Sequence, residues 1–155
     1  MQVSPQGLSF IAGFEGCVLH PYDDGGRPGV GNATIGVGHL IHMGPVRPAD
    51  VKAYAGFTKA KALTLLSADA GHAEQAVSSL GIHFSQPQFD ALVSFAFNCG
   101  GGALMGGIAH HLHAGDDLGA MDVLCEYTHA GSTVSPGLVR RRHAEAHLFL
   151  TGKYS

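Results

Sequence analysis

The chain has 155 residues, 45% of them hydrophobic, and a formal net charge of −3 when its 11 histidines are neutral. That length fits one domain with a sizeable core, and the charge argues against nucleic acid as a partner, because the basic residues form no stripe beyond 140–142. No stretch is apolar enough to cross a bilayer, and no apolar run follows a charged amino terminus, so we expect neither a membrane anchor nor a secretory signal.

The first predicted element is a helix over 5–15. Ser4 can cap its free N–H groups, Pro5 suits the first helical position, and Gly16 can end it. Apolar residues recur at intervals of three or four, and Glu15 falls in line with them. We therefore expect Glu15 on or beside the buried face, where burial and the carboxyl end of the helix would favour a protonated side chain. A solvated glutamate in the last turn is the alternative.

A glycine-rich segment follows this helix. Short, partly β-branched stretches at 20–24 and 33–39 flank a middle segment that is rich in glycine and contains Pro28. This composition is typical of turns. We predict a small β-hairpin here, which would bring Asp24 and Thr34 close together across a long turn. Taken alone, the pair Asp23-Asp24 before a glycine is typical of an Asx-type turn.

The middle of the chain is predicted to be irregular over 40–57, with a short helical turn near 49–53. Helical periodicity then extends over 58–80, where leucine, alanine and valine recur every three or four positions. Gly71 lies inside that stretch and weakens its centre by about 1 kcal/mol relative to alanine.

The remaining chain is predicted to be helical with short breaks. Ser85 and Gln88 form a capping box that starts a helix with apolar residues on more than one face, and Asn98 closes this helix. The expected elements are helices over 85–98, 103–113 and 116–127, a loop over 128–135, and a last helix over 136–151 that begins with Ser135 and Pro136.

Two carboxyl groups and one hydroxyl group in the first part of the chain match the groups needed to hydrolyse a glycosidic bond. Hydrolysis of a glycosidic bond needs two carboxyl groups that flank the bond, one protonated and one ionised. An enzyme that inverts the anomeric carbon also needs space and an orienting group for a water molecule. Glu15 as acid, Asp24 as base and Thr34 as the group that orients water would fill these roles.

The same residues resemble the motif of the phage-type lysozymes, the endolysins of glycoside hydrolase family twenty-four. The resemblance covers nearly the whole chain in the family's order. Its segments are Glu15, Tyr22-x-Asp24, Thr34-Ile-Gly-x-Gly-His39, Gln88-Phe-Asp-Ala-Leu-Val-Ser-Phe-Ala-Phe-Asn98, Gly137-Leu-Val-x-Arg141-Arg142-x-x-Glu145 and Phe149-x-Thr-Gly152. The turn between Asp24 and Thr34 is longer than in the family's best-known members, which leaves Asp23 as an alternative to Asp24.

The resemblance implies hydrolysis of the β-1,4 bond between N-acetylmuramic acid and N-acetylglucosamine in peptidoglycan, with inversion and with Glu15, Asp24 and Thr34 in the roles given above. The supporting or substrate-binding residues would be Tyr22, His39, Asn98 and Arg141.

Three of these supporting residues have a more specific expectation from the resemblance. His39 would form an ion pair with Asp69, tying the hairpin to the helix that follows. Arg141 would pair with Glu15, and the alternative is that the arginines at 140–142 form a solvated face. Asn98 would contact sugar or orient the acid, and the alternative is a helix cap.

The expected fold is α+β, a mostly helical, two-lobed lysozyme-like fold in a single domain over 1–155. Residues from 1 to about 57 would form a small β-hairpin lobe, 58–80 a long inter-lobe helix, and 81–155 a helical lobe.

We expect no cofactor and no metal, because the histidines near 110–113 have no obvious carboxylate or cysteine partners at ligand spacing. The odd number of cysteines leaves at least one unpaired. Synthesis in the cytoplasm favours reduced thiols at Cys17, Cys99 and Cys125, and a redox role for Cys17 is the alternative.

Partners and location follow from the resemblance. We expect a monomer that acts on the glycan strands of peptidoglycan, made in the host cytoplasm and released to the wall through a membrane pore. Three other functions compete with hydrolysis: a lytic transglycosylase that needs only the acid, a chitinase-like enzyme, and a non-catalytic module that binds the wall.

Overall fold

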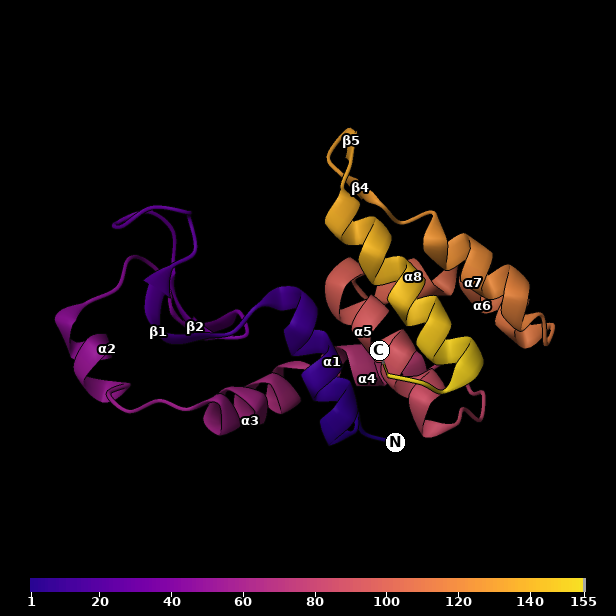
Figure 1. Ribbon diagram of the computed structural model, residues 1–155, viewed down its shortest axis with the longest axis horizontal. Coiled ribbons are helices and arrows are strands. Elements are labelled where there is room, and N and C mark those ends of the chain that lie inside the picture. Colours follow the sequence, from indigo (N-terminus) through magenta and orange to yellow (C-terminus); the bar gives the residue numbers. More distant parts are fainter. Residues whose placement is uncertain (155) are drawn as a thin grey trace. The chain divides into compact units, whose positions relative to one another are not determined.

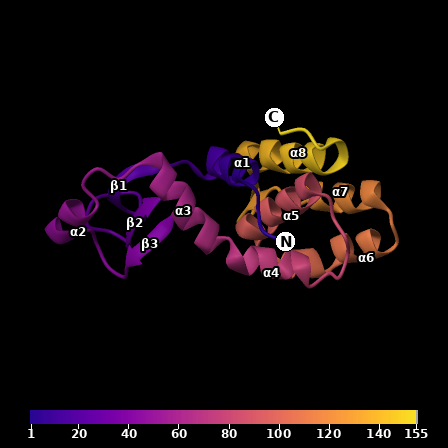
Figure 2. The same ribbon diagram turned by 90° about the horizontal axis from the view of Figure 1, so that it is seen from below.

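The computed structural model describes residues 1–154 and divides the chain into two compact units. One unit consists of residues 11–69, and the other combines residues 1–10 with the chain from Ala70 onward. The first unit contains the main β-sheet, and the second is largely helical (Figures 1 and 2). The predicted α+β class is confirmed. Within the described residues, no helix combines the length and apolarity needed to span a membrane.

The unit of residues 11–69 contains an antiparallel sheet whose strand order is β1-β2-β3. All four residues of β2 are buried, which makes this strand the core of the unit. Its elements are the end of α1 (Pro5–Glu15), β1 (Val18–Asp23), β2 (Ala33–Gly36), β3 (His39–His42), α2 (Pro48–Ala53) and α3 (Lys59–Asp69).

The sheet therefore has three strands, one more than the predicted two-stranded hairpin. The segment after His39 was expected to be irregular, but it forms β3 and pairs with the second strand of the hairpin. Its two terminal histidines and its half-exposed Leu40 hide the alternation of apolar and polar residues that identifies a strand. The sheet, rather than propensity along β3, stabilises this segment.

Helix α3 packs against β2 and β3, and Figure 2 shows it beside them. Gly36 permits this close approach. Its φ is +66°, and a Cβ atom there would lie 3.3 Å from the Cβ of Ala62. A side chain at position 36 would thus strain the backbone and crowd Ala62, so this position favours glycine.

The predicted continuous helix over 58–80 is wrong. The chain forms α3 and a separate helix, α4 (Gly71–Ser78), with Ala70 between them in a turn. Gly71 is the first residue of α4, so its low helix propensity acts at a boundary. The same boundary separates the two units.

The largely helical unit is built around α5 (Gln86–Cys99), which packs against α4 and α8. Residues 89–96 of α5 are all buried, as expected for a central helix. The predicted capping box at Ser85 and the cap at Ser135 are confirmed. The remaining elements are the 3-10 helix η1 (Gly101–Met105), α6 (Gly107–His113), α7 (Asp117–Cys125), the two-residue strands β4 (His129–Ala130) and β5 (Thr133–Val134), and α8 (Pro136–Thr151).

A buried carboxylate fastens both ends of the described chain to α5. Asp90 accepts hydrogen bonds from the backbone N–H of Ser4 at 3.0 Å and from the hydroxyl of Tyr154 at 2.6 Å. Burial, together with the bond to Asp90, raises the pKa of Tyr154 to about 12. Ser4 also caps α1 as predicted, since its Oγ accepts from the N–H of Gly7 at 3.0 Å.

Candidate active site

Asp24 and Thr34 both bond to Asn32 at the end of the β1–β2 ribbon. The backbone N–H of Asn32 donates to Asp24 Oδ1 at 2.7 Å, and the hydroxyl of Thr34 donates to the carbonyl oxygen of Asn32 at 3.1 Å. The N–H of Asp24 donates to that same carbonyl at 3.1 Å. Two of the predicted site residues thus share one neighbour, and Thr34 is buried while Asp24 is exposed.

The structure distinguishes the two adjacent aspartates. Both carboxylate oxygens of Asp23 accept short backbone bonds, from the N–H of Gly29 at 2.6 Å and from the N–H of Val46 at 2.6 Å. Among residues 1–154, Asp24 has one such bond on Oδ1, while its Oδ2 has only a 3.4 Å contact with the side-chain amide of Asn32. Asp23 therefore holds two loops together, and Asp24 keeps an oxygen with a weak partner.

The long turn between Asp24 and Asn32 is ordered by its own hydrogen bonds. The N–H of Gly25 donates to the carbonyl of Val30 at 3.0 Å. Gly31 has a φ of +96°, and a Cβ atom at this position would meet Asp24 Oδ1 at 2.1 Å. Glycine at 31 is therefore required for the Asp24 carboxylate to lie where it does.

Glu15 is the last residue of α1, as predicted, but its side chain is exposed. The prediction that it lies on or beside the buried face is wrong. The buried stripe of α1 ends at Ala12, and the whole last turn from Gly13 is exposed. Helical periodicity gives the direction of a side chain but not whether another element covers the final turn. The convergence of Glu15 on Asp24 and Thr34 stays a prediction.

Two supporting residues lie on the same sheet. Tyr22 is the register partner of Thr34, and partial burial and the negative charge of Asp24 raise the pKa of its phenol. His39 Nδ1 lies 2.9 Å from Asp69 Oδ2, so the predicted ion pair between β3 and α3 is confirmed. The role of either residue in substrate binding stays a prediction.

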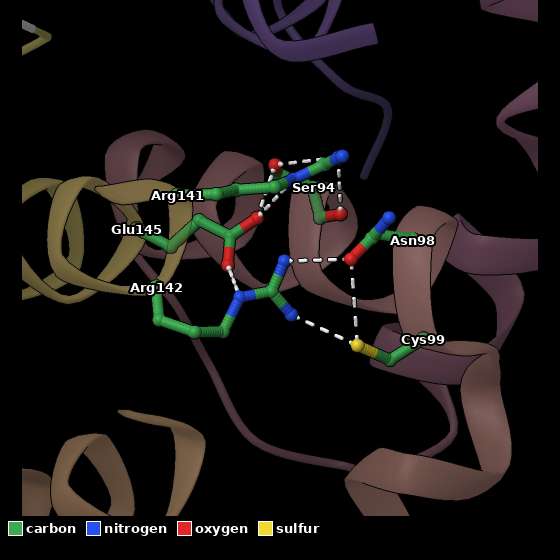
Figure 3. A network of polar contacts seen from close by, with 6 residues as sticks. All are labelled: Ser94, Asn98, Cys99, Arg141, Arg142 and Glu145. Atoms are coloured by element: carbon green, nitrogen blue, oxygen red, sulfur yellow. Dashed lines mark hydrogen bonds and ion pairs between the residues drawn. The ribbon is translucent and has the colours of Figure 1, made fainter. Parts of the chain in front are cut away.

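In the helical unit, Arg141 and Asn98 belong to a buried polar network (Figure 3). Arg141 donates to Glu145 Oε1 at 3.0 Å and to the carbonyl of Ser94 at 3.1 Å. Arg142 lies with its Nε 3.0 Å from Glu145 Oε2, an ion pair without hydrogen-bond geometry. Burial raises the pKa of Glu145, and the charges of Arg142 and Arg141 oppose that shift.

Asn98 forms the solvent-facing edge of this network. Its Oδ1 accepts from Arg142 Nη2 at 2.8 Å, while Arg142 Nη1 lies 2.8 Å from Cys99 Sγ (Figure 3). The side chains of Asn98 and Cys99 also line a surface pocket with Glu126 and Tyr127. The alternative of a solvated face is wrong for Arg141 and Arg142, which are 3% and 0% exposed. The pairing of Arg141 with Glu15 stays a prediction.

Sequence reasoning missed Asn32 and the burial of Glu145. An asparagine two residues from a threonine in a turn suggests a local backbone bond, but the link to Asp24 depends on how the turn closes. For Glu145, the spacings of three and four residues to the two arginines would have predicted ion pairs on one helix. Complete burial of those pairs follows from packing against α5, which spacing does not reveal.

The family model described as phage lysozyme matches residues 12–145, which include every residue of both polar clusters. The chain belongs to the phage lysozyme family.

Members of the family resemble this chain in sequence and in fold. The endolysin of Bacillus phage B103 is 36% identical over 155 residues, which is 99% of this chain and 56% of that protein. The endolysin of Salmonella phage P22 is 35% identical over 153 residues, covering 97% of this chain and 99% of that protein. A solved endolysin from Escherichia coli O157:H7 phage FAHEc1 has a TM-score of 0.83 at 30% identity, covering 100% of this chain and 97% of that one.

Lengths differ within the family. This chain spans between 56% and 60% of the length of the first four curated relatives. The P22 endolysin, by contrast, is matched over nearly its full length.

Proposed function

We propose that this member of the phage lysozyme family is a muramidase that hydrolyses the β-1,4 bond between N-acetylmuramic acid and N-acetylglucosamine in peptidoglycan. The observation that carries the proposal is the joining of Asp24 and Thr34 through Asn32 at the end of the ribbon. A carboxylate with a weakly bonded oxygen next to a fixed hydroxyl suits the activation of a water molecule.

In the proposed reaction Glu15 is the general acid and Asp24 the general base. Water attacks the anomeric carbon on the face opposite the leaving sugar, and Asp24 accepts one proton of that water. The bond between the anomeric carbon and the bridging oxygen breaks, and Glu15 protonates that oxygen. Thr34 orients the water. The anomeric configuration inverts, because the new oxygen arrives on the opposite face.

The proposed partners are the glycan strands alone. We infer that the chain acts as a monomer on the bacterial wall after synthesis in the host cytoplasm and release through a membrane pore. The surface pocket lined by Tyr22, Asp23 and Arg27 adjoins the ribbon and offers a cation to an anionic wall polymer.

The variants that test this proposal are Glu15→Gln, Asp24→Asn and Thr34→Ala, assayed by the release of reducing ends from purified peptidoglycan and from chitin. The first two should lose several orders of magnitude in rate, since general acid and base contributions are each about 10²–10⁴-fold. Thr34→Ala should lose less. Activity on chitin alone would favour the chitinase-like reading.

Two remaining alternatives predict different products from peptidoglycan. A lytic transglycosylase needs only the acid and leaves 1,6-anhydro ends, so it would release no new reducing ends, and mass spectrometry would find fragments lacking one water from both the unmodified chain and Asp24→Asn. A non-catalytic module would cleave no bonds in peptidoglycan, and Glu15→Gln would leave its binding to the wall unchanged.

A further inference from the structure

We propose that Asn32 is a positioning residue that aims the carboxylate of Asp24 and sets the direction of the Thr34 hydroxyl. This inference rests on the proposed function. Asn32 does not need to touch the sugar for this role. It acts through hydrogen bonds to two side chains that would both contact the attacking water.

Asn32 contacts both oxygens of the Asp24 carboxylate. The backbone N–H of Asn32 holds Oδ1 at 2.7 Å, and the side-chain amide of Asn32 lies 3.4 Å from Oδ2. The strong bond fixes the plane of the carboxylate, while the weak contact leaves Oδ2 as the oxygen that can accept a proton. Gly31 leaves the space for Oδ1, where a Cβ atom would clash.

Asn32 also orients the hydroxyl of Thr34. A hydroxyl has one proton to donate and two lone pairs that can accept. Thr34 donates its proton to the carbonyl of Asn32 at 3.1 Å. Its lone pairs are then the groups available to a water molecule, so Thr34 would accept a hydrogen bond from the water rather than donate one to it.

Together the two side chains can direct both protons of one water molecule. One O–H would point to Asp24 Oδ2 and the other to Thr34 Oγ1. The lone pairs of that water are then free to face the anomeric carbon. Asn32 determines this arrangement because its backbone N–H bonds to the Asp24 side chain and its backbone carbonyl to the Thr34 side chain.

Asn32 is itself held in place by Gly44. Its side-chain Oδ1 accepts from the N–H of Gly44 at 3.0 Å, and the N–H of Ala33 donates to the carbonyl of Gly44 at 2.8 Å. A backbone N–H can only donate, so it selects the oxygen of the amide and turns the amide NH₂ toward Asp24. The segment after β3 therefore fixes the orientation of the amide.

The decisive variant is Asn32→Asp. The new carboxylate at position 32 can still accept a hydrogen bond from the N–H of Gly44. Its second oxygen would replace the amide nitrogen that now lies 3.4 Å from Asp24 Oδ2. Two like charges at this distance disfavour ionisation of the base. The acidic limb of the kcat/KM profile on peptidoglycan should move up by about one pH unit or more. The alkaline limb, which would report the acid, should stay in place.

The other ionisable groups beside Asp24 are unchanged in this variant. Tyr22 lies close enough for the charge of Asp24 to raise its pKa, and Asp23 is bonded to Gly29 and Val46. The control is Ser67→Asp, which adds the same charge at an exposed position of α3. Its profile should superimpose on that of the unmodified chain.

Asn32→Ala is the second variant. It removes the amide and its bond to Gly44 but keeps the backbone bonds to Asp24 and Thr34. Because a small misplacement of catalytic groups costs up to about 10²-fold, kcat should fall about 10- to 100-fold with KM nearly unchanged. This variant carries the test by itself if Asn32→Asp does not fold.

The outcomes separate the two proposals. If the unmodified chain releases no reducing ends from peptidoglycan, the proposed function fails. If it is active and requires Asp24, the inference about Asn32 is overturned by an Asn32→Asp profile that matches Ser67→Asp. An unchanged kcat in Asn32→Ala would overturn it as well.

Discussion

The two polar clusters of this protein differ in their contact with water. In the helical unit, Glu145 is 0% exposed and lies against the guanidinium groups of Arg141 and Arg142. In the ribbon, Asp24 is exposed and bonded to Asn32. One cluster places two guanidinium groups against a single carboxylate out of water, and the other presents a carboxylate to the solvent.

The comparison indicates what each cluster can do. A buried ion pair loses hydration and must be fully matched, so removing one member is costly to folding. An exposed carboxylate costs little to maintain and can meet a substrate. We therefore expect substitutions of Asp24 and Thr34 to affect the reaction and substitutions in the buried network to affect stability.

The largest expected effect is on catalysis. Asp24→Asn should reduce the rate of peptidoglycan hydrolysis by about 10³-fold or more, with little change in the free energy of unfolding. Asp23→Asn is the matched variant, because it changes the adjacent carboxylate that binds the N–H groups of Gly29 and Val46. It should lower stability and keep most of the activity. Reversed results for the two variants would assign the base to Asp23.

The next effect is on folding. Glu145→Gln should lower the free energy of unfolding, measured by urea denaturation, by about 3–5 kcal/mol, because two buried guanidinium groups lose their counter-charge. Arg140→Ala on the exposed side of the same helix should change it by about 0.5 kcal/mol or less. Equal effects in the two variants would contradict the contrast between the clusters.

The smallest expected effect is on the pH dependence of stability, and it comes from an ion pair that is neither buried nor catalytic. His42 Nε2 lies 2.9 Å from Asp50 Oδ2, and His42 Nδ1 lies 2.9 Å from the carbonyl of Met43. The backbone bond to Met43 and the bond to Asp50 raise the pKa of His42, while the backbone bond to Arg47 and the bond to His42 lower the pKa of Asp50.

The sign of the pH dependence follows from these two shifts. The His42 contribution is complete below its ordinary pKa of about 6.5 and is lost as the pH rises through the raised value. The Asp50 contribution is present above its ordinary pKa of about 3.9 and is lost as the pH falls through the lowered value. His42→Gln should therefore cost more stability at pH 5 than at pH 8. His72→Gln, on the exposed side of α4, is the control.

The parts of the fold that depend on local chemistry could be predicted from the sequence. Ser4, Ser85 and Ser135 cap helices because the cap is formed within one turn. The His39–Asp69 pair was reached through the family resemblance rather than through spacing. The predictions that were wrong concern features that depend on tertiary contacts. Strand β3 forms because β2 lies beside it, and the exposure of Glu15 depends on what covers the last turn of α1.

The site was only partly predictable for the same reason. Tyr22, Asp24 and Thr34 follow a motif in the sequence, so they could be named. Asn32 could not be assigned a role, because its function depends on the closure of a long turn and on an anchor at Gly44. Resemblance identifies residues that touch the substrate more readily than residues that hold them in place.

Digestion of purified peptidoglycan in water enriched in oxygen-18, followed by mass spectrometry of the released fragments, tests the central claim most directly. Activation of water by Asp24 and Thr34 predicts one labelled oxygen at the new reducing end of every fragment, and loss of these fragments in Asp24→Asn. Unlabelled 1,6-anhydro fragments that persist in Asp24→Asn would contradict the account.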